Sequence, residues 1–421
     1  MENQVSQQFV VEGGRRLNGE LHIKAAKNAV LPIIAASILS SEDIIIQNVP
    51  DLLDIRNMLV IMQSLGCKAE FKNGNIYLNC RDAKASLVTA DLTRALRSSI
   101  FMLGPILSRF GEVELGLPGG CAIGKRPIDI HIDGLRALGV KVEEKECSIV
   151  CKKRKSIEGE FRLKFPSVGA TENLIMAGVL SNGTTIIYNA AKEPEVVDLS
   201  NFINALGGRI TGAGTNTVVI KGVKKLYGAI YSPSADRIAA PTYLAAGAIT
   251  RGCVTMRGIS CATIGSCLNA FEAIGCSIIC GRDFVTLKLN RRPKTISKLI
   301  TTPHPGFPTD MQPQIGAILS LAKGTSIITE TIFENRFRYA LELQKFGALT
   351  NVATQSTEIC GVKQLKPAEV VAEDLRGGAA LTIAALATNG KSIIKDIHHI
   401  DRGYEKFEEG LRSLGASIVR I

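Results

Sequence analysis

The chain of 421 residues contains no tryptophan, and aromatic residues make up only 5% of it. Proteins that bind single-stranded nucleic acid stack bases on aromatic side chains that lie among cations. The two basic runs, 152–155 and 291–294, contain no aromatic residue, and we interpret both as solvated strand ends or loops. The low aromatic content therefore argues against a nucleic-acid partner.

Histidine is also scarce, with five residues, and the sequence has neither a His-Glu-x-x-His motif nor a Cys-x-x-Cys pair. These are spacings by which zinc sites are recognised in a sequence. We therefore expect neither a metal ion nor another cofactor.

No apolar run is long enough to span a bilayer, and the longest candidate, 29–39, is interrupted by Pro32. The first residues, Met-Glu-Asn-Gln-Val, lack the basic and then apolar stretches of a secretory signal. Eleven cysteines, an odd number, are spread through apolar surroundings. We expect reduced thiols and a cytoplasmic protein without a membrane span.

The rest of the composition is that of a globular protein, with 46% hydrophobic and 21% charged residues. The length predicts two domains or more. The formal net charge is +11, and the sequence pI is near 9.1. Such an excess suits nucleic acid, an anionic membrane or small anionic substrates.

Six repeats organise the chain, and each contains a glycine after a bulky apolar residue. The spacing of these glycines is 68–73 residues. They are Gly66, Gly139, Gly207, Gly275, Gly347 and Gly415. Five such intervals between six copies define one supersecondary unit that is used six times.

The first repeat shows what each unit contains. Apolar residues between Ile55 and Leu65 fall on one face of a helix. Gly66 then supplies a left-handed end to that helix. Two short apolar runs follow on either side of Asn73-Gly74, a dipeptide typical of a β-hairpin. Each unit is therefore predicted to contain a helix followed by a hairpin.

A second helix in each unit is apolar nearly all round, which predicts a buried helix. The six copies are 25–41, 91–110, 168–182, 236–251, 309–323 and 374–389. Their polar residues gather at the N-terminal ends, where free backbone N–H groups favour anions. These residues are Lys27, Asn28, Arg94, Arg97, Ser167, Asp236, Arg237, Asp310, Asp374 and Arg376.

Two interpretations of these polar residues stay open. Ser167 and Asp374 are suited to capping the helices and doing nothing more. Lys27, Arg97 and Arg376 are poor caps, because cations are disfavoured at helix starts unless a bound anion compensates. The helix starts therefore predict an anion site.

Three repeats followed by three repeats predict two similar lobes. We place the first lobe at 21–234, and the second at 1–20 together with 235–421. A ligand-binding cleft between two such lobes is the expected location of the site.

The segment 117–129 carries the second chemical signal. It contains Gly119, Gly124 and Lys125 at the spacing of a nucleotide-binding P-loop, but Arg126 replaces the Ser or Thr that would hold magnesium. We therefore reject the P-loop. A glycine-rich loop with Cys121 near two cations remains, and neighbouring cations favour a nucleophilic or acid–base thiol. Asp129 and His131, taken alone, are expected to be structural.

The sequence resembles the UDP-N-acetylglucosamine 1-carboxyvinyltransferases, enolpyruvyl transferases of peptidoglycan synthesis that are the target of fosfomycin. The resemblance covers nearly the whole chain. Eight motifs in the same order carry it: 26–29, 118–127, 167–171, 193–195, 308–312, 333–337, 374–376 and 399–405. It implies an α/β fold of two lobes, each with three βαβαββ-type units in an inside-out α/β barrel.

The resemblance also implies a reaction and a set of site residues. The enolpyruvyl group of phosphoenolpyruvate is transferred to the 3′-hydroxyl of UDP-N-acetylglucosamine, with release of phosphate. Cys121 matches the loop cysteine that acts as general acid and is alkylated by fosfomycin, and Asp310 matches the carboxylate that deprotonates the sugar hydroxyl. The catalytic matches are Cys121, Asp310, Lys27, Arg402 and Asp374, and the substrate-binding matches are Lys27, Asn28, Arg97, Arg126, Pro127, Ile128, Asp129, Ile130, Ser167, Val168, Asp310, Ile332, Arg376 and Arg402.

Two other functions are alternatives to this one. The shikimate-pathway enolpyruvyl transferases share the six-repeat fold but lack the Pro-Gly-Gly-Cys loop, so Cys121 favours the UDP-sugar enzyme. A nucleic-acid-binding repeat protein would use the charge of +11 and would show a steep salt dependence of binding. We expect no nucleic-acid partner, and a monomer.

Overall fold

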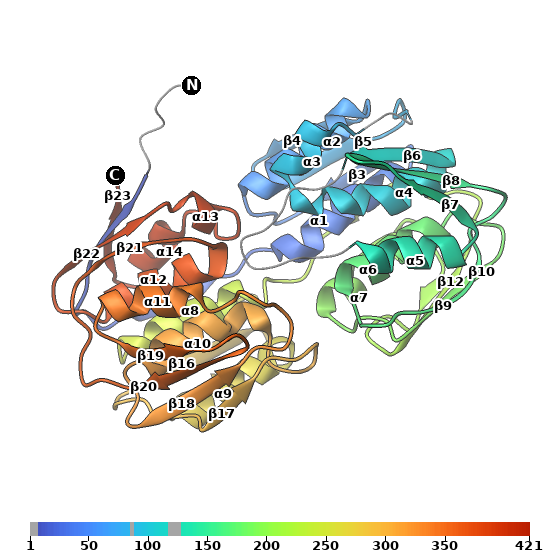
Figure 1. Cartoon of the computed structure of the whole chain (residues 1–421). Helices are drawn as coiled ribbons and strands as arrows, with labels where there is room; N and C mark the ends of the chain where they lie inside the picture. Colours follow the sequence, from blue (N-terminus) through green and yellow to red (C-terminus); the bar gives the residue numbers. More distant parts are fainter. Residues whose placement is uncertain (1–6, 85–87, 117–127) are drawn as a thin grey trace. The chain divides into compact units, whose positions relative to one another are not determined.

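The computed structural model describes residues 7–84, 88–116 and 128–421. The described chain divides into two compact units. Residues 25–84, 88–116 and 128–234 form one, which we call the central unit, and residues 7–24 with 235–421 form the other, the terminal unit. Figure 1 labels the helices and strands of both.

The described strands form five four-stranded sheets and one three-stranded sheet, and no closed barrel. In the central unit the sheets are β13 (Ala229–Tyr231), β3 (Asp43–Ile46), β5 (Asn75–Asn79) and β4 (Lys68–Lys72); β6 (Glu112–Gly116), β8 (Ser148–Lys153) and β7 (Val140–Glu144); and β9 (Gly159–Arg162), β10 (Thr184–Tyr188), β12 (Thr217–Lys221) and β11 (Ile210–Thr211). In the terminal unit they are β2 (Asn18–His22), β14 (Cys253–Arg257), β16 (Phe284–Lys288) and β15 (Ser277–Cys280); β17 (Lys298–Ile300), β18 (Thr325–Thr329), β20 (Ser356–Cys360) and β19 (Leu349–Val352); and β21 (Glu369–Val371), β22 (Lys391–Lys395), β1 (Phe9–Glu12) and β23 (Ser417–Arg420).

All six sheets follow one pattern. An edge strand pairs in parallel with the second strand of the sheet. The second strand pairs antiparallel with the third, which in turn pairs antiparallel with the fourth. In the three-stranded sheet a parallel bridge from Val88 to Leu115 takes the place of the edge strand. In the last sheet β1 lies between β22 and β23 and replaces the second strand of the hairpin. The structure therefore confirms a mixed α/β fold built from repeated units.

The helices alternate with these strands along the chain. In the central unit they are α1 (Lys27–Ala36), η1 (Ser37–Leu39), α2 (Leu53–Ser64), α3 (Ala90–Ala95), η2 (Arg97–Met102), α4 (Leu103–Phe110), α5 (Asp129–Ala137), α6 (Val168–Gly178) and α7 (Pro194–Ala205). In the terminal unit they are α8 (Ala239–Ile249), η3 (Cys261–Ile264), α9 (Gly265–Ile274), η4 (Thr309–Met311), α10 (Gln312–Leu319), α11 (Arg338–Lys345), α12 (Leu375–Leu386), α13 (His398–Asp401) and α14 (Phe407–Ser413). None of the helices in the described ranges is long and apolar enough to cross a membrane.

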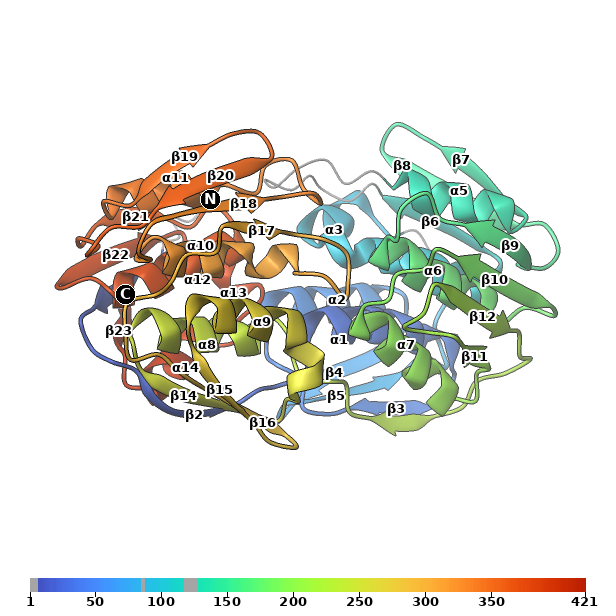
Figure 2. The same ribbon diagram turned by 90° about the horizontal axis from the view of Figure 1, so that it is seen from below.

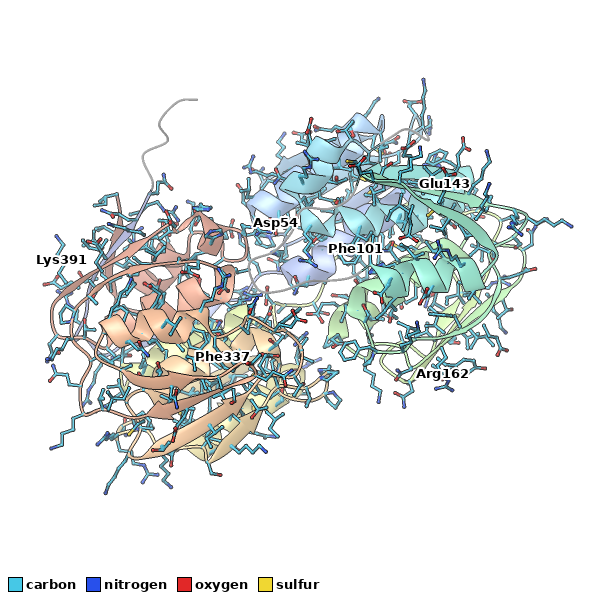
Figure 3. All side chains as sticks on the ribbon, viewed as in Figure 1. Asp54, Phe101, Glu143, Arg162, Phe337 and Lys391 are labelled. Carbon is cyan, nitrogen blue, oxygen red and sulfur yellow. A yellow bond between two sulfur atoms is a disulfide. The ribbon has the colours of Figure 1, made fainter. Side chains whose placement is uncertain are left out.

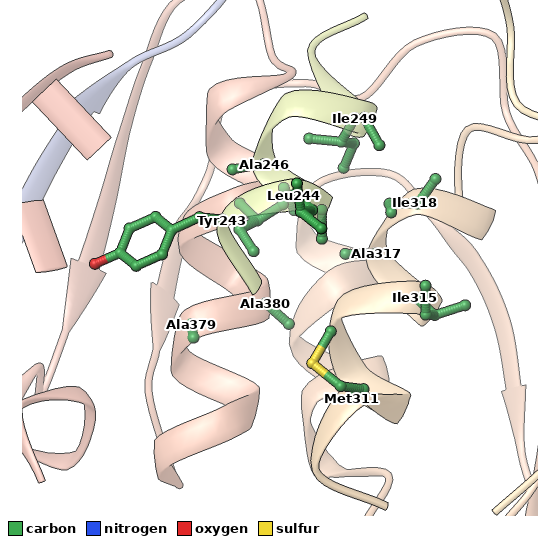
Figure 4. Packing of buried hydrophobic residues seen from close by; sticks show 14 of the residues in the cluster. Tyr243, Leu244, Ala246, Ile249, Met311, Ile315, Ala317, Ile318, Ala379 and Ala380 are labelled. Atoms are coloured by element: carbon green, nitrogen blue, oxygen red, sulfur yellow. The ribbon is translucent and has the colours of Figure 1, made fainter. Parts of the chain in front are cut away.

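The apolar helices lie inside their units, with the sheets outside (Figures 1 and 2). In the terminal unit α8, α10 and α12 pack against one another, and Leu244, Ile315 and Ala380 are buried between them (Figure 4). Nearly every residue of these helices is buried, as their apolar circumference predicts. The expected buried helices are thus confirmed.

The repeat glycines end their helices in the way the sequence predicts. All six have a positive φ, between 85° at Gly347 and 100° at Gly275. L-residues with a Cβ rarely adopt this left-handed conformation, so glycine is selected at the helix end. The hairpin predicted at Asn73-Gly74 is also present, because β4 and β5 pair antiparallel across it.

Two local expectations are wrong. The helix expected over 91–110 is broken at Leu96, which is extended, and the 3₁₀ helix η2 lies between α3 and α4. The expectation that all thiols are reduced fails for Cys261 and Cys280, which form a disulfide. The start of η3 and the end of β15 bring their Cα atoms to 5.9 Å, a proximity that cysteine spacing in the sequence cannot reveal.

Candidate functional site

Asp310 lies in η4, directly before α10 in the terminal unit, between two buried arginines. Its Oδ1 accepts a hydrogen bond of 2.9 Å from Nη2 of Arg336, and its Oδ2 accepts one of 3.1 Å from Nε of Arg376. The Asp310 side chain is 26% exposed, whereas those of Arg336 and Arg376 are 3% and 4% exposed. The carboxylate is therefore held in one orientation and still reaches solvent.

Arg376 connects the starts of three buried helices. It lies in the first turn of α12, it forms an ion pair with Asp310 before α10, and it feels the charge of Asp236 before α8. Burial alone would lower the pKa of Arg376, but Tyr404, Asp310 and Asp236 together raise it above its usual value. The polar helix starts predicted from the sequence therefore do meet within the terminal unit.

Both arginines keep hydrogen-bonding capacity. Nη1 of Arg376 and Nε of Arg336 are buried and have no hydrogen-bond partner among the described residues. Buried N–H groups of charged side chains are rarely left unpaired, because each unpaired group costs the desolvation it has lost. The cluster of Asp310, Arg336 and Arg376 is therefore suited to bind an anion or an oxygen-rich ligand.

The helix caps account for three of the predicted polar residues. Oδ1 of Asp374 accepts hydrogen bonds from the backbone N–H groups of Arg376 and Gly377, at 2.9 and 3.0 Å. Ser167 accepts one of 3.4 Å from Ala170 at the start of α6, and Asp236 accepts two at the start of α8. Capping is thus observed for all three, and a catalytic role of Asp374 stays a prediction.

Arg402 follows α13, and its partly buried side chain lies near His399. Burial lowers the pKa of His399, and the charges of His398 and Arg402 lower it further, while Asp374 opposes them. The fields of Arg402 and Asp374 therefore act on one imidazole of the terminal unit.

Ile332 lies in the loop after β18, which Glu330 holds in place. Oε1 of Glu330 accepts hydrogen bonds from the N–H of Ile332 and from the hydroxyl of Thr301, both at 2.8 Å. Its Oε2 accepts one of 2.8 Å from Thr309, the neighbour of Asp310. One buried carboxylate therefore positions both the Ile332 loop and the start of η4.

In the central unit Lys27 is the first residue of α1. Its Nζ donates a hydrogen bond of 2.7 Å to Oδ2 of Asp54, which lies in the first turn of α2 (Asp54 is labelled in Figure 3). The side chains are 11% and 3% exposed. The cation that the sequence analysis found out of place at a helix start is thus neutralised by a buried carboxylate.

The other described residues predicted to bind substrate in the central unit lie at helix starts. Arg97 begins η2, Val168 begins α6, and Asp129 begins α5. Asn28 and Asp129 are exposed, whereas Arg97, Ile128, Ile130 and Val168 are partly buried. The start of α6 packs on η2, where Gly169 lies against Phe101 (labelled in Figure 3) and Asn173 donates to the carbonyl of Ile100. Arg97 and Val168 therefore begin two helices that pack together.

His131, expected to be structural, is buried beneath these helix starts. Its Nδ1 lies 2.9 Å from Nδ2 of Asn173, and the geometry fits an acceptor nitrogen on a neutral ring. Burial lowers the pKa of His131 to about 4, although the charge of Asp129 opposes this effect. The imidazole is therefore neutral at physiological pH.

We expect acid to destabilise the central unit through His131. Between pH 6.5 and 4 the unfolded chain binds a proton at this position that the folded chain excludes, so stability falls as the pH falls. The loss by pH 4 is about 3 kcal/mol, at 1.36 kcal/mol per pKa unit. Thermal unfolding of His131→Gln should show a weaker pH dependence over this range than the parent. The exposed His22→Gln serves as control, and equal slopes for parent and His131→Gln would contradict the prediction.

The ring of Tyr404 lies beside Arg376, and both side chains are buried. The guanidinium lies 5.2 Å from the centroid of the Tyr404 ring. The phenol is 2.9 Å from the hydroxyl of Thr242 and accepts a hydrogen bond of 3.3 Å from Nε2 of Gln314. A buried polar network thus runs from α8 and α10 to the arginine that holds Asp310.

Removing the phenol should loosen this network. We expect Tyr404→Phe to lower stability by about 1 kcal/mol, the usual worth of a buried hydrogen bond. For a unit of this size that corresponds to a fall of about 2–4 °C in the thermal midpoint. The exposed Tyr77→Phe is the matched control, and a midpoint equal to that of the parent would show that the phenol contributes nothing.

The residues that hold the predicted ones in place are visible only in the structure. Asp54, Glu330, Arg336 and Tyr404 were not proposed as site residues. Arg336 and Tyr404 lie in two of the motifs that carry the family resemblance, 333–337 and 399–405. The position of Arg336 between Phe333 and Phe337 is a signal that could identify it. Asp54 gives no signal, because it lies in the first turn of a helix that is otherwise ordinary.

Cys121, Arg126 and Pro127 lie outside the described residues, so their predicted roles stay predictions. In the part of the chain that the structure describes, no three His, Cys, Asp or Glu side chains gather where they could hold a metal ion.

Comparison with known proteins identifies relatives over nearly the full length. The family model for EPSP synthase (3-phosphoshikimate 1-carboxyvinyltransferase) matches residues 11–411. A protein named UDP-N-acetylglucosamine 1-carboxyvinyltransferase 2, from Caldanaerobacter subterraneus subsp. tengcongensis, is 47% identical over 413 residues, which cover 98% of this chain and 99% of that protein. A UDP-N-acetylglucosamine 1-carboxyvinyltransferase from Coxiella burnetii is 44% identical over 415 residues, or 98% of this chain and 96% of that one.

Solved structures share the fold at lower identity. The enolpyruvyl transferase NikO from Streptomyces tendae matches with a TM-score of 0.89 and 23% identity, and the match covers 99% of both chains. EPSP synthase from Acinetobacter baumannii matches with a TM-score of 0.76 and 17% identity, over 99% of this chain and 100% of that one. At these identities the likeness extends to the fold alone.

Proposed function

Since the chain belongs to the family of EPSP synthase (3-phosphoshikimate 1-carboxyvinyltransferase), we propose that it is an enolpyruvyl transferase that uses phosphoenolpyruvate and UDP-N-acetylglucosamine. It transfers the enolpyruvyl group to the 3′-hydroxyl of the sugar and releases phosphate. This is the first committed step of peptidoglycan synthesis.

The choice of acceptor rests on two relatives named UDP-N-acetylglucosamine 1-carboxyvinyltransferase, which match nearly the full length of this chain. At 44–47% identity, a match over 98% of the chain includes both units and every described residue that the sequence analysis proposed for the site. The shikimate-pathway enzyme is the second candidate, because the family model bears its name. The relatives at 44–47% identity bear the name of the UDP-sugar enzyme, which favours the UDP-sugar acceptor.

The proposed chemistry is an addition followed by an elimination. Asp310 takes the proton of the sugar hydroxyl while the hydroxyl oxygen adds to C2 of phosphoenolpyruvate. Cys121 gives a proton to C3. Loss of a C3 proton and of phosphate then leaves the enol ether. A positioned acid or base contributes about 10²- to 10⁴-fold to the rate of such a step.

Cationic side chains are proposed to replace the water around the anionic substrate. Lys27, Arg126 and Arg402 serve the phosphate and carboxylate, and Asp374 and Arg376 act near the reacting carbons. Asn28, Arg97, Arg126 to Ile130, Ser167, Val168 and Ile332 contact the nucleotide sugar. The unpaired N–H groups of Arg336 and Arg376 support this role, because each charge-assisted hydrogen bond to a ligand contributes about 1.5–3 kcal/mol.

The substrates also indicate where the protein works. Phosphoenolpyruvate and UDP-sugars are cytoplasmic metabolites, and we propose a cytoplasmic enzyme that acts as a monomer and binds no nucleic acid. Among the described cysteines, Cys261–Cys280 is the single disulfide, whereas small secreted domains are typically held by several.

Phosphate release tests the proposal directly. We expect release with phosphoenolpyruvate and UDP-N-acetylglucosamine together, and none with either alone. Mass spectrometry should show a UDP-sugar that has gained an enolpyruvyl group. Turnover with shikimate 3-phosphate in place of the UDP-sugar would move the chain to the sister activity, and turnover with neither acceptor would refute the proposal.

A further inference from the structure

The terminal unit contains an open cavity of about 320 Å³ at the ends of its three buried helices. Ile249 of α8, Leu321 after α10 and Leu386 of α12 line it. Asp310 and Arg376 lie at the starts of α10 and α12, so the cavity is at the other end of the helix bundle. Figure 4 shows this separation, with Met311 near the helix starts and Ile249 near the helix ends.

Four cations surround the cavity: Arg15, Arg16, Arg251 and Lys363. No acidic residue is among its lining side chains, which otherwise include Thr250, Gln364 and Asn389. The side chains of the four cations form no ion pair or hydrogen bond with any described residue. Four unpaired like charges around one cavity repel one another, and a bound anion would relieve that repulsion.

Capping of the helix ends does not explain these cations. Positive side chains are favoured at helix C-termini because they donate to the last carbonyl groups. At the end of α10 Arg292 already does so, donating to the carbonyls of Leu321 and Ala322 at 2.9 and 2.7 Å. Arg109 serves the corresponding place in the central unit, with 2.6 Å to the carbonyl of Ile38. The side chains of the four cavity cations donate to no carbonyl of a described residue, so capping does not account for them.

The backbone that carries two of the cations is fixed. The N–H groups of Gly13 and Gly14 donate to the carbonyls of Gly390 and Leu386, both at 3.0 Å. A Cβ at Gly13 would lie 2.4 Å from the carbonyl oxygen of Ala385, so only glycine allows this close approach. The loop that bears Arg15 and Arg16 is thus fastened to the end of α12.

Arg251 lies just after α8, where its N–H donates to the carbonyl of Ala248 at 3.1 Å. It has a φ of 54°, a left-handed conformation that is unfavourable for a residue with a Cβ. Gly324 and Gly390 adopt positive φ near the ends of the neighbouring helices α10 and α12. Left-handed residues are common helix ends, so this conformation fixes the backbone that carries Arg251.

We propose that this cavity binds a small anion with two or more linked phosphate groups. Two phosphates carry about three to four negative charges, which matches the four cations. The planar guanidinium groups of three arginines suit bidentate contacts with phosphate oxygens. The cavity volume is near the lower limit for small-ligand sites, which range from about 300 to 1,000 Å³. The proposal does not depend on the proposed enzymatic activity.

Calorimetric titration of the full chain with pyrophosphate, tripolyphosphate and orthophosphate tests it. We expect the two linked phosphates to bind more tightly than orthophosphate. The variants Arg15→Ala/Arg16→Ala and Arg251→Gly/Lys363→Ala should each weaken tripolyphosphate binding about tenfold or more. Arg251→Gly suits the positive φ, and the other changes are in exposed side chains, so folding should be preserved.

The control variant Lys288→Ala/Lys298→Ala removes the same charge from exposed strands of the same unit and should bind like the parent. A further titration with a nucleoside triphosphate distinguishes a nucleotide ligand from a free polyphosphate. The nucleotide binds more tightly than tripolyphosphate only if the protein also contacts the nucleoside. Equal binding by the parent and both cavity variants would overturn the proposal. So would binding that phosphoenolpyruvate displaces completely, because the anion would then occupy the catalytic site.

Discussion

Replacing Asp310 by asparagine is expected to lower kcat by about 10²- to 10⁴-fold, the usual contribution of a placed base. An amide has nearly the shape of the carboxylate but does not take a proton from the sugar hydroxyl. The loss should fall on kcat more than on the KM for UDP-N-acetylglucosamine, because the nucleotide contacts are unchanged. Initial rates of phosphate release measure both parameters.

The matched variant Asp374→Asn distinguishes a catalytic role of a carboxylate from a structural one. Asp374 belongs to the same cluster, since its Oδ1 lies 3.9 Å from Nη1 of Arg336, but its hydrogen bonds are those of a cap. Asparagine caps helices about as well as aspartate. Asp374→Asn should therefore keep the fold, and its kcat reports whether this carboxylate has the proposed catalytic role. An Asp310→Asn variant with the parent kcat would refute the assignment of Asp310 as the base.

The repeat architecture could be predicted because local physics repeats with it. A left-handed glycine ends a helix whatever lies around it, and all six predicted glycines adopt that conformation. The apolar circumference of helices such as α8 likewise requires burial. The break at Leu96 was missed because several neighbouring residues favour helix, and the extended residue is set by tertiary packing.

The sequence identifies charged residues of the site but not the side chains with which they pair. The chemistry of helix starts singled out Lys27 and Arg376, whose charges needed a compensating group. The structure supplies carboxylates as partners, Asp54 for the first and Asp310 for the second. Such pairs depend on which helices meet in three dimensions, and one sequence gives no direct measure of that.

The same limit explains Glu330 and the disulfide. Glu330 is an unremarkable residue at the end of β18, and only the folded chain shows that four hydrogen bonds converge on it. Cys261 and Cys280 are 19 residues apart with a helix between them, and their pairing arises from the return of the chain in β15. Long-range contacts of this kind carry no local signature.

The second large effect is expected from Cys121→Ala. Without the thiol no acid is placed at C3 of phosphoenolpyruvate, and we expect turnover to fall by about 10²- to 10⁴-fold or below detection. The epoxide fosfomycin should inactivate the parent but should no longer modify the variant. Intact-protein mass spectrometry after incubation with fosfomycin measures the modification independently of activity.

The described cysteines provide the control that makes this test specific. Cys147 and Cys360 are free and exposed, whereas Cys67, Cys151 and Cys267 are buried. Burial raises the pKa of the Cys151 and Cys267 thiols to about 12, so these thiols are unreactive at neutral pH. If exposure alone governed alkylation, Cys147→Ala/Cys360→Ala would lose modification and Cys121→Ala would retain it. If the two cations that follow Cys121 by four and five residues lower the pKa of its thiol, the pattern is reversed, and the assignment of Cys121 as the reactive acid depends on that reversal.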